Sequence, residues 1–209
     1  MRKLILSIAL ASLSLCGGIV QANDIQAGQQ YSVLPNAVPV AQPGKIEVVE
    51  LFWYGCPHCY ELERDIGPWA QTLPDDVKFV RIPAMFGGVW NVHGQAFLAL
   101  EAMGAASHIH KAIFEAYHTE GKKLATPEAF ADFVSTQGID RDTFLQTFNS
   151  FAIKGQAEKA RKLAMAYQVT GVPVLIVNGK YRFDVGSAGG QLEALKVANF
   201  LIARERDAH

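Results

Sequence analysis

The sequence predicts an α/β fold in which a mixed β-sheet carries an all-helical insertion. Two observations lead to this class. Short runs rich in β-branched and aromatic residues occur toward both ends of the chain, whereas residues 88–155 repeat their apolar positions at helical spacing. The composition is that of a folded domain, since 50% of the 209 residues are hydrophobic and 19% are charged. The formal net charge of −1 gives no basic excess, so no nucleic-acid partner is expected.

The first 22 residues have the pattern of a secretory signal peptide. Arg2 and Lys3 precede an apolar run over residues 4–15, and a stretch containing small residues ends at Ala22. This run is shorter than the ~20 residues that a spanning helix needs, and Gly17-Gly18 follows it, so cleavage after Ala22 is favoured over an uncleaved anchor. We therefore expect a mature chain of 187 residues with a formal charge of −3, located in the bacterial periplasm.

Five short segments are predicted to be strands. They are residues 31–34, 45–54, 77–82, 174–177 and 180–183. The β-branched and aromatic content of the second suits a central strand that is buried on both faces. The last two flank Asn178-Gly179, which favours a type I′ turn and therefore a hairpin.

Helices are expected at about residues 59–71, through the insertion at 88–155, and at about 152–167 and 191–204. Within the insertion, Thr126-Pro127 and Asp140 have the residue types of helix starts. Its regularly spaced aromatic residues are assigned to the core and not to a ligand site. The sheet would then belong to one domain formed by residues 23–87 and 156–209.

The chemistry is concentrated in Cys56-Pro57-His58-Cys59, between a buried strand and a helix. Because Cys16 leaves with the signal peptide, these are the two cysteines of the mature chain. A helix N-terminus favours an anion, so Cys56 is predicted to be a nucleophilic thiolate. Pro57 loses no amide hydrogen bond in the first turn, and a protonated His58 would add positive charge beside the sulfur. Cys59 should be more buried and less reactive.

This asymmetry predicts dithiol–disulfide exchange through a redox-active Cys56–Cys59 pair. A substrate thiolate would attack Cys56, and a mixed disulfide would be the intermediate. A lowered pKa of Cys56 stabilises the reduced form, and it therefore makes the oxidised form a stronger oxidant.

The cysteine pair is also compatible with a zinc site or with a structural disulfide. Cys-x-x-Cys forms half of some zinc sites, and His93, His108, His110 and His118 offer further ligands, although a second cysteine pair is missing. A structural disulfide across so short a loop would add little stability. Neither a metal nor another cofactor is predicted.

The motif Phe-Trp-Tyr-Gly-Cys-Pro-His-Cys at residues 52–59, with Gly171-Val172-Pro173 far downstream, resembles the DsbA family of periplasmic thiol:disulfide oxidoreductases. The resemblance covers nearly the whole mature chain. It implies a thioredoxin fold formed by residues 23–87 and 156–209, with a helical domain inserted at 88–155. It also implies that Val172-Pro173 is a cis-proline loop that faces the disulfide and presents the Val172 backbone to an extended substrate peptide.

Acidic residues near the site also match the family. Glu50 is expected to lie buried beneath the cysteines, where burial would raise its pKa and let it carry a proton to or from Cys59. Glu63 matches a second family acid. Arg81 stands where the family has a lysine, and an arginine does not release a proton, so no titrating role is expected at that position.

The resemblance implies a monomeric enzyme that introduces disulfide bonds into newly exported proteins. Its substrates would be unfolded exported proteins with cysteine thiols, and a DsbB-like, quinone-linked membrane oxidase would reoxidise it. A disulfide isomerase or reductase of the same fold is the alternative, and a metal-binding module is a more distant one. The family's isomerases carry an additional N-terminal dimerisation domain, and the short stretch before the strand at 45–54 favours the monomeric oxidase.

Overall fold

The computed structural model describes residues 25–208. The expected signal peptide, residues 1–22, lies outside the described residues. Between residues 25 and 208 there is no helix with the length and apolar character needed to cross a membrane.

The described residues contain a five-stranded mixed sheet. Its strands are β1 (Ser32–Val33), β2 (Ile46–Phe52), β3 (Val77–Pro83), β4 (Val174–Val177) and β5 (Tyr181–Asp184). The spatial order is β1-β5-β4-β2-β3, in which β2 and β3 are parallel and the other neighbours are antiparallel. Every residue of β2 is buried, as its β-branched and aromatic sequence predicts. The mixed sheet that the sequence predicts is therefore confirmed.

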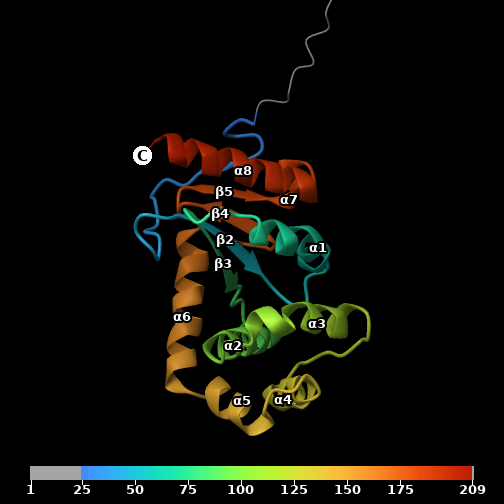
Figure 1. Ribbon diagram of the computed structural model, residues 1–209. Helices are drawn as coiled ribbons and strands as arrows, with labels where there is room; N and C mark the ends of the chain where they lie inside the picture. The colour runs from blue at the N-terminus through green and yellow to red at the C-terminus, as the bar shows by residue number, and fades with distance from the viewer. Residues whose placement is uncertain (1–24, 209) are drawn as a thin grey trace, which may run out of the picture.

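Helices cover both faces of the sheet and one of its ends (Figure 1). They are α1 (Pro57–Gln71), α2 (Gly88–Ala102), α3 (Ala106–His118), α4 (Pro127–Ser135), α5 (Arg141–Phe148), α6 (Phe151–Ala166), α7 (Val185–Ala188) and α8 (Gln191–Asp207). Helices α1 and α8 share a core with one face of the sheet, and α6 packs against the other. Helices α2 to α5 form a third core that also includes Phe52, Tyr54 and both cysteines. The segment of the two cysteines thus lies where the sheet meets the helical insertion.

Several local predictions are confirmed. Thr126 and Asp140 are N-caps whose side chains accept hydrogen bonds from the backbone of Ala129 at 3.2 Å and Thr143 at 2.8 Å. Asn178-Gly179 adopts φ values of 51° and 62°, the left-handed conformation that a type I′ turn requires. Helix α6 runs without interruption across residues 155 and 156, so a domain boundary at that point would divide one helix.

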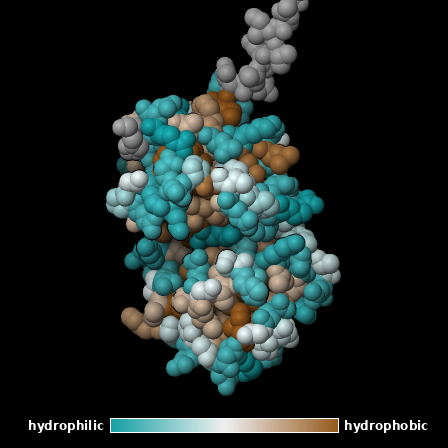
Figure 2. Space-filling model, viewed as in Figure 1, coloured by the Kyte–Doolittle hydropathy of each residue, from teal (hydrophilic) through white to brown (hydrophobic). Residues whose placement is uncertain are grey.

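The face in Figure 2 is mostly hydrophilic, with hydrophobic residues in scattered patches. Among the described residues, the exposed large hydrophobic side chains lie on β1, before α2, on α6 and on α8: Val33, Phe86, Phe151, Met165, Leu192 and Phe200. Dispersed exposed residues of this kind are ordinary in a globular protein.

His93 is a buried histidine of helix α2, and it lies in an aromatic environment. The rings of Trp53, Tyr117 and Phe130 surround it at centroid distances of 5.4 to 5.8 Å. Its Nδ1 has no hydrogen-bond partner among the described residues. Burial lowers its pKa from 6.5 to about 4.

Because the pKa of His93 is lowered, we expect the free energy of unfolding to decrease in mild acid. Below pH 6.5 the unfolded chain takes up a proton that the folded His93 resists until about pH 4, so stability falls as the pH is lowered through this window. The loss amounts to ~3 kcal/mol. Urea unfolding of His93→Gln should show a flatter pH dependence, whereas His108→Gln, on the exposed surface of α3, should retain the slope of the parent protein. Equal slopes in all three proteins would contradict the prediction.

Candidate active site

Strand β2 and helix α1 position the cysteine pair. A tight turn follows β2, and Cys56 is the N-cap of α1, with φ −88° and ψ 117°. Its sulfur accepts a hydrogen bond from the Cys59 backbone N–H at 3.3 Å. Pro57 is the first helical residue, where a missing N–H costs nothing. The sulfur of Cys56 therefore lies at the positive end of the helix, as its place in the sequence predicts.

The two thiols are not equivalent. The hydrogen bond from the Cys59 thiol is the main cause that lowers the pKa of Cys56, from 9.0 to about 6. The backbone of Cys59 and the backbone and charge of His58 act in the same direction, and burial opposes them. Burial is the main cause that raises the pKa of Cys59, which is fully enclosed, and the neighbouring Cys56 adds to the increase. One thiol is thus suited to react as a nucleophile and the other to remain protonated.

Titration of the reduced protein should separate these thiols. Thiolate absorbance is expected to rise once near pH 6, with the second thiol still protonated at alkaline pH. In Cys59→Ala the remaining thiol should ionise at higher pH, because its principal hydrogen bond is gone. Cys56→Ala serves as the control and should show no ionisation in the neutral range. Two thiols that ionise together near the ordinary value would rule out this assignment.

The loop before β4 faces the cysteine pair. The peptide bond between Val172 and Pro173 is cis. The Cys56 thiol donates a hydrogen bond to the carbonyl oxygen of Val172 at 3.4 Å. Pro173 is buried, and Val172 is partly exposed beside the sulfur. The structure thus brings together these two residues, which are 116 positions or more from Cys56 in the sequence.

Glu50 belongs to a buried charge cluster beneath the site. It lies opposite Arg81 in the parallel pairing of β2 with β3, and Arg81 Nε donates to its carboxylate at 3.1 Å. Arg81 Nη2 donates to Glu63 of α1 at 2.7 Å. Burial raises the pKa of Glu50 to about 7, although the charge of Arg81 acts against the increase. Glu50 can therefore exchange a proton near neutral pH.

Two residues for which the sequence predicted no place in this cluster, His110 and Tyr54, extend it. His110 of α3 lies with its Nε2 at 3.5 Å from the Glu63 carboxylate, and its Nδ1 is 2.9 Å from the Tyr54 hydroxyl. Burial opposes ionisation of Glu63, but the neighbouring His110 and Arg81 outweigh it and lower the pKa of Glu63. His110 shares the apolar face of its helix with Ile113, which is the sequence signal that would have indicated its burial.

The remaining histidines near the motif have different surroundings. His58 is exposed, and its Nδ1 lies 3.2 Å from the Glu61 carboxylate. His118 donates from Nε2 to the backbone oxygen of Tyr54 at 2.8 Å and stacks on Tyr60. In the described part of the chain, no group of three or more His, Cys, Asp or Glu side chains could hold a metal ion.

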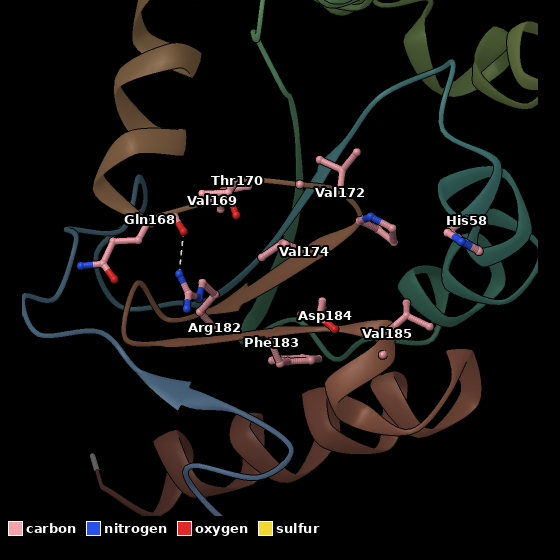
Figure 3. Close-up of a pocket in the computed structure, with 13 residues that line it drawn as sticks. His58, Gln168, Val169, Thr170, Val172, Val174, Arg182, Phe183, Asp184 and Val185 are labelled. Carbon is pink, nitrogen blue, oxygen red and sulfur yellow. Dashed lines mark hydrogen bonds between the residues drawn. The ribbon is translucent and has the colours of Figure 1, made fainter.

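A groove of about 470 Å³ adjoins the Val172 loop (Figure 3). The segment from Gln168 to Val174 forms one side, and the end of β5 with the start of α7 forms the other. His58 lies at one end, and Gln168 and Arg182 lie together at the opposite end. The loop of Val172 forms part of the groove wall, next to the Cys56 sulfur.

The fold and site together define a class. A mixed sheet with a Cys-x-x-Cys pair at a helix N-terminus, facing a cis-proline loop, is the arrangement of thioredoxin-fold dithiol proteins. The family model of the DsbA-like thioredoxin domain matches residues 47–196. The chain belongs to this family, and it is a thiol:disulfide oxidoreductase.

Known proteins resemble it over nearly their full lengths. The thiol:disulfide interchange protein DsbA of Pseudomonas aeruginosa is 64% identical over 208 residues, which are all of this chain and 99% of that protein. The protein of the same name from Azotobacter vinelandii is 61% identical over 213 residues, covering all of both chains. The crystal structure of P. aeruginosa DsbA has a TM-score of 0.87 with 66% identity, over 90% of this chain and 97% of that one.

Proposed function

We propose that this protein introduces disulfide bonds into newly exported proteins in the periplasm, with Cys56 as the reacting thiol. The observation that carries the proposal is the contrast between the two cysteines. Cys56 at the start of α1 has a pKa of about 6, whereas burial raises the pKa of Cys59 beneath it. A stable Cys56 thiolate favours the reduced protein and therefore makes the oxidised protein a good electron acceptor.

The exchange has two steps. A substrate thiolate attacks the Cys56 sulfur, the Cys56–Cys59 bond breaks, and Cys59 leaves and takes up a proton. This step produces a mixed disulfide between Cys56 and the substrate. A second substrate thiolate then attacks the substrate sulfur and releases Cys56 as a thiolate. The substrate loses two electrons to the protein, which ends in the dithiol form.

We assign to Glu50 the role of supplying the proton that Cys59 takes up in the first step. Its carboxyl is half protonated at about pH 7 and is electrostatically coupled to both cysteines. Arg81 and Glu63 hold the carboxyl in place through the hydrogen bonds to Arg81. Arg81 itself stays charged throughout, because a guanidinium does not release a proton.

Substrate binding is assigned to the Val172-Pro173 loop. An extended peptide that pairs with the Val172 backbone would carry its cysteine across the Cys56 sulfur, which lies 3.4 Å from the Val172 oxygen. His58 would contribute its charge when protonated, and Pro57 the start of the helix. This proposal includes cleavage of the signal peptide after Ala22 and action as a monomer.

Repeated turnover requires that the dithiol be oxidised again. We assign this step to a quinone-linked membrane oxidase like DsbB, whose reactive disulfide would enter the same Cys56 exchange in reverse. The unfolded exported proteins and this oxidase would thus react in turn with the same sulfur, that of Cys56. The family membership supports this arrangement, as does the full burial of Cys59, which leaves Cys56 the more accessible sulfur of the pair.

Equilibration of the mature protein with reduced and oxidised glutathione tests the proposal. A dithiol oxidase should remain largely reduced in glutathione buffers that keep an ordinary structural cysteine pair in its disulfide form. Its oxidised form should convert a reduced two-cysteine peptide to the disulfide stoichiometrically. A strongly reducing couple that leaves the peptide unchanged would instead favour the reductase or isomerase alternative.

A further inference from the structure

The groove beside the active site has an unbalanced cation at the end distant from His58. Figure 3 shows Arg182 and Gln168 together at this end, on opposite walls. Arg182 Nη1 donates to the Gln168 backbone oxygen at 2.5 Å. This bond uses one of five N–H donors and leaves the rest of the fork available to a ligand.

Rigid strands on both sides support Arg182. It lies opposite Ser32 of β1 and Ile176 of β4, and its own backbone oxygen accepts a hydrogen bond from the Ser32 hydroxyl. A side chain that extends from a strand paired on both sides is well positioned before any ligand binds. The hydrogen bond to Gln168 further restricts the guanidinium.

The charge of Arg182 is not matched by a carboxylate. Among the described residues it forms no ion pair, whereas other arginines do so, namely Arg81, Arg141, Arg161 and Arg206. The acidic residue of the groove wall is Asp184, and it is the N-cap of α7, whose carboxylate accepts the Ser187 N–H at 2.8 Å. The carboxylate of the groove wall is therefore already hydrogen-bonded as a helix cap, and Arg182 can bind a carboxylate from a ligand.

We propose that Arg182 is a specificity-determining residue that selects substrates with an acidic side chain at a defined distance from the reacting cysteine. This inference rests on the proposed function, in which a peptide pairs with Val172. Ile176, which lies opposite Arg182, is four residues beyond Val172. Four residues of extended chain span ~13 Å, so the acid belongs about four residues from the residue that pairs with Val172.

The chemistry favours a carboxylate over other anionic or polar groups of a peptide. An arginine guanidinium binds a carboxylate through two parallel hydrogen bonds, one to each of the two carboxylate oxygens. The groove is partly enclosed, which strengthens the pair relative to one in bulk water. We expect the preference to be about tenfold in kcat/KM at low salt and smaller at high salt.

The experiment uses a set of reduced two-cysteine peptides. One cysteine is fixed, the second lies well outside the groove, and a single Glu or Gln is placed at each position from two to six residues on either side of the first. The ratio of oxidation rates for each Glu and Gln pair is measured with excess oxidised mature protein. A ratio of about ten is expected at one position near four residues, on one side of the cysteine only.

Charge variants identify the residue responsible. Arg182→Gln should abolish the Glu preference, and Arg182→Glu should replace it with a preference for Lys at the same position. Arg161→Gln removes an equivalent side chain from the exposed surface of α6, where Arg161 binds Glu158, and should leave the ratios unchanged. General damage to the groove would slow all peptides together, whereas loss of the selected contact changes the ratio.

The outcomes separate this inference from the proposed function. Equal rates for every Glu and Gln pair, with all peptides oxidised, would overturn the role of Arg182 and leave the oxidase function intact. A preference that persists in Arg182→Gln would do the same. If the oxidised protein reacts neither with these peptides nor with dithiothreitol, the proposed function itself fails.

Discussion

The Cys59→Ala variant should accumulate a stable mixed disulfide with glutathione, whereas the parent protein should pass through it to an internal disulfide. In both proteins the Cys56 thiolate attacks oxidised glutathione, forms the mixed disulfide and releases one reduced glutathione. Only the parent has a second thiol at the base of the site to displace the bound glutathione. Intact mass after incubation at pH 8 distinguishes the adduct from the internal disulfide.

The reciprocal variant provides the control. Cys56→Ala should form the adduct more than about a hundredfold more slowly, because Cys59 is fully enclosed and burial raises its pKa. A pH of 8 is needed because loss of the Cys59 thiol removes the hydrogen bond that most strongly lowers the pKa of Cys56. Comparable adduct formation in the two variants would refute the assignment of Cys56 as the nucleophile.

Features that depend on nearby residues could be predicted from the sequence. A run rich in β-branched and aromatic residues is sufficient to predict β2, and Asn178-Gly179 is sufficient to predict the hairpin turn between β4 and β5. The position of Cys56 at the start of α1 follows from a buried strand followed by a proline-containing helix start. In each case the physical cause lies within a few residues of the feature.

Features that depend on tertiary pairing could not be predicted in the same way. Tyr54 and His110 are 56 positions apart, and only the packing of α3 against the active-site turn brings them together. The placement of Arg182 in the groove likewise depends on the register of β5 beside β4. Helix α7 was not predicted, because its four residues are too few to show a helical period.

The position of Arg81 depends both on the local sequence and on the tertiary pairing of strands. The sequence indicates a cation in the strand that follows the motif, but the parallel register of β2 and β3 is what places it against Glu50. The same guanidinium also reaches Glu63, so one buried cation compensates two acids. Its removal would leave Glu50 without its hydrogen-bonded cation and Glu63 with His110 as its remaining neighbour.

Arg81→Met is therefore expected to lower the free energy of unfolding by about 3–5 kcal/mol, the usual cost of breaking a buried ion pair by removing one partner. Urea unfolding of the oxidised protein measures this loss without a contribution from the Cys56 thiolate. Arg81→Lys should lose less, because it keeps the charge but not the fork that reaches both acids. Arg206→Met breaks the exposed pair with Asp76 and should have a much smaller effect.

The loss of unfolding free energy in Arg81→Met should depend on pH, because Glu50 titrates near neutral pH. Burial already raises the pKa of Glu50 to about 7, and loss of Arg81 removes the charge that opposes the increase. A carboxyl whose folded pKa lies above its unfolded value stabilises the fold below the unfolded pKa, and this stability is lost as the pH rises through the folded pKa. The penalty in Arg81→Met should thus be larger at pH 8 than at pH 5, and Glu50→Gln in the same chain should recover part of it. A penalty that is equal at both pH values, or that Glu50→Gln does not reduce, would mean that Arg81 stabilises the fold by packing and not by charge.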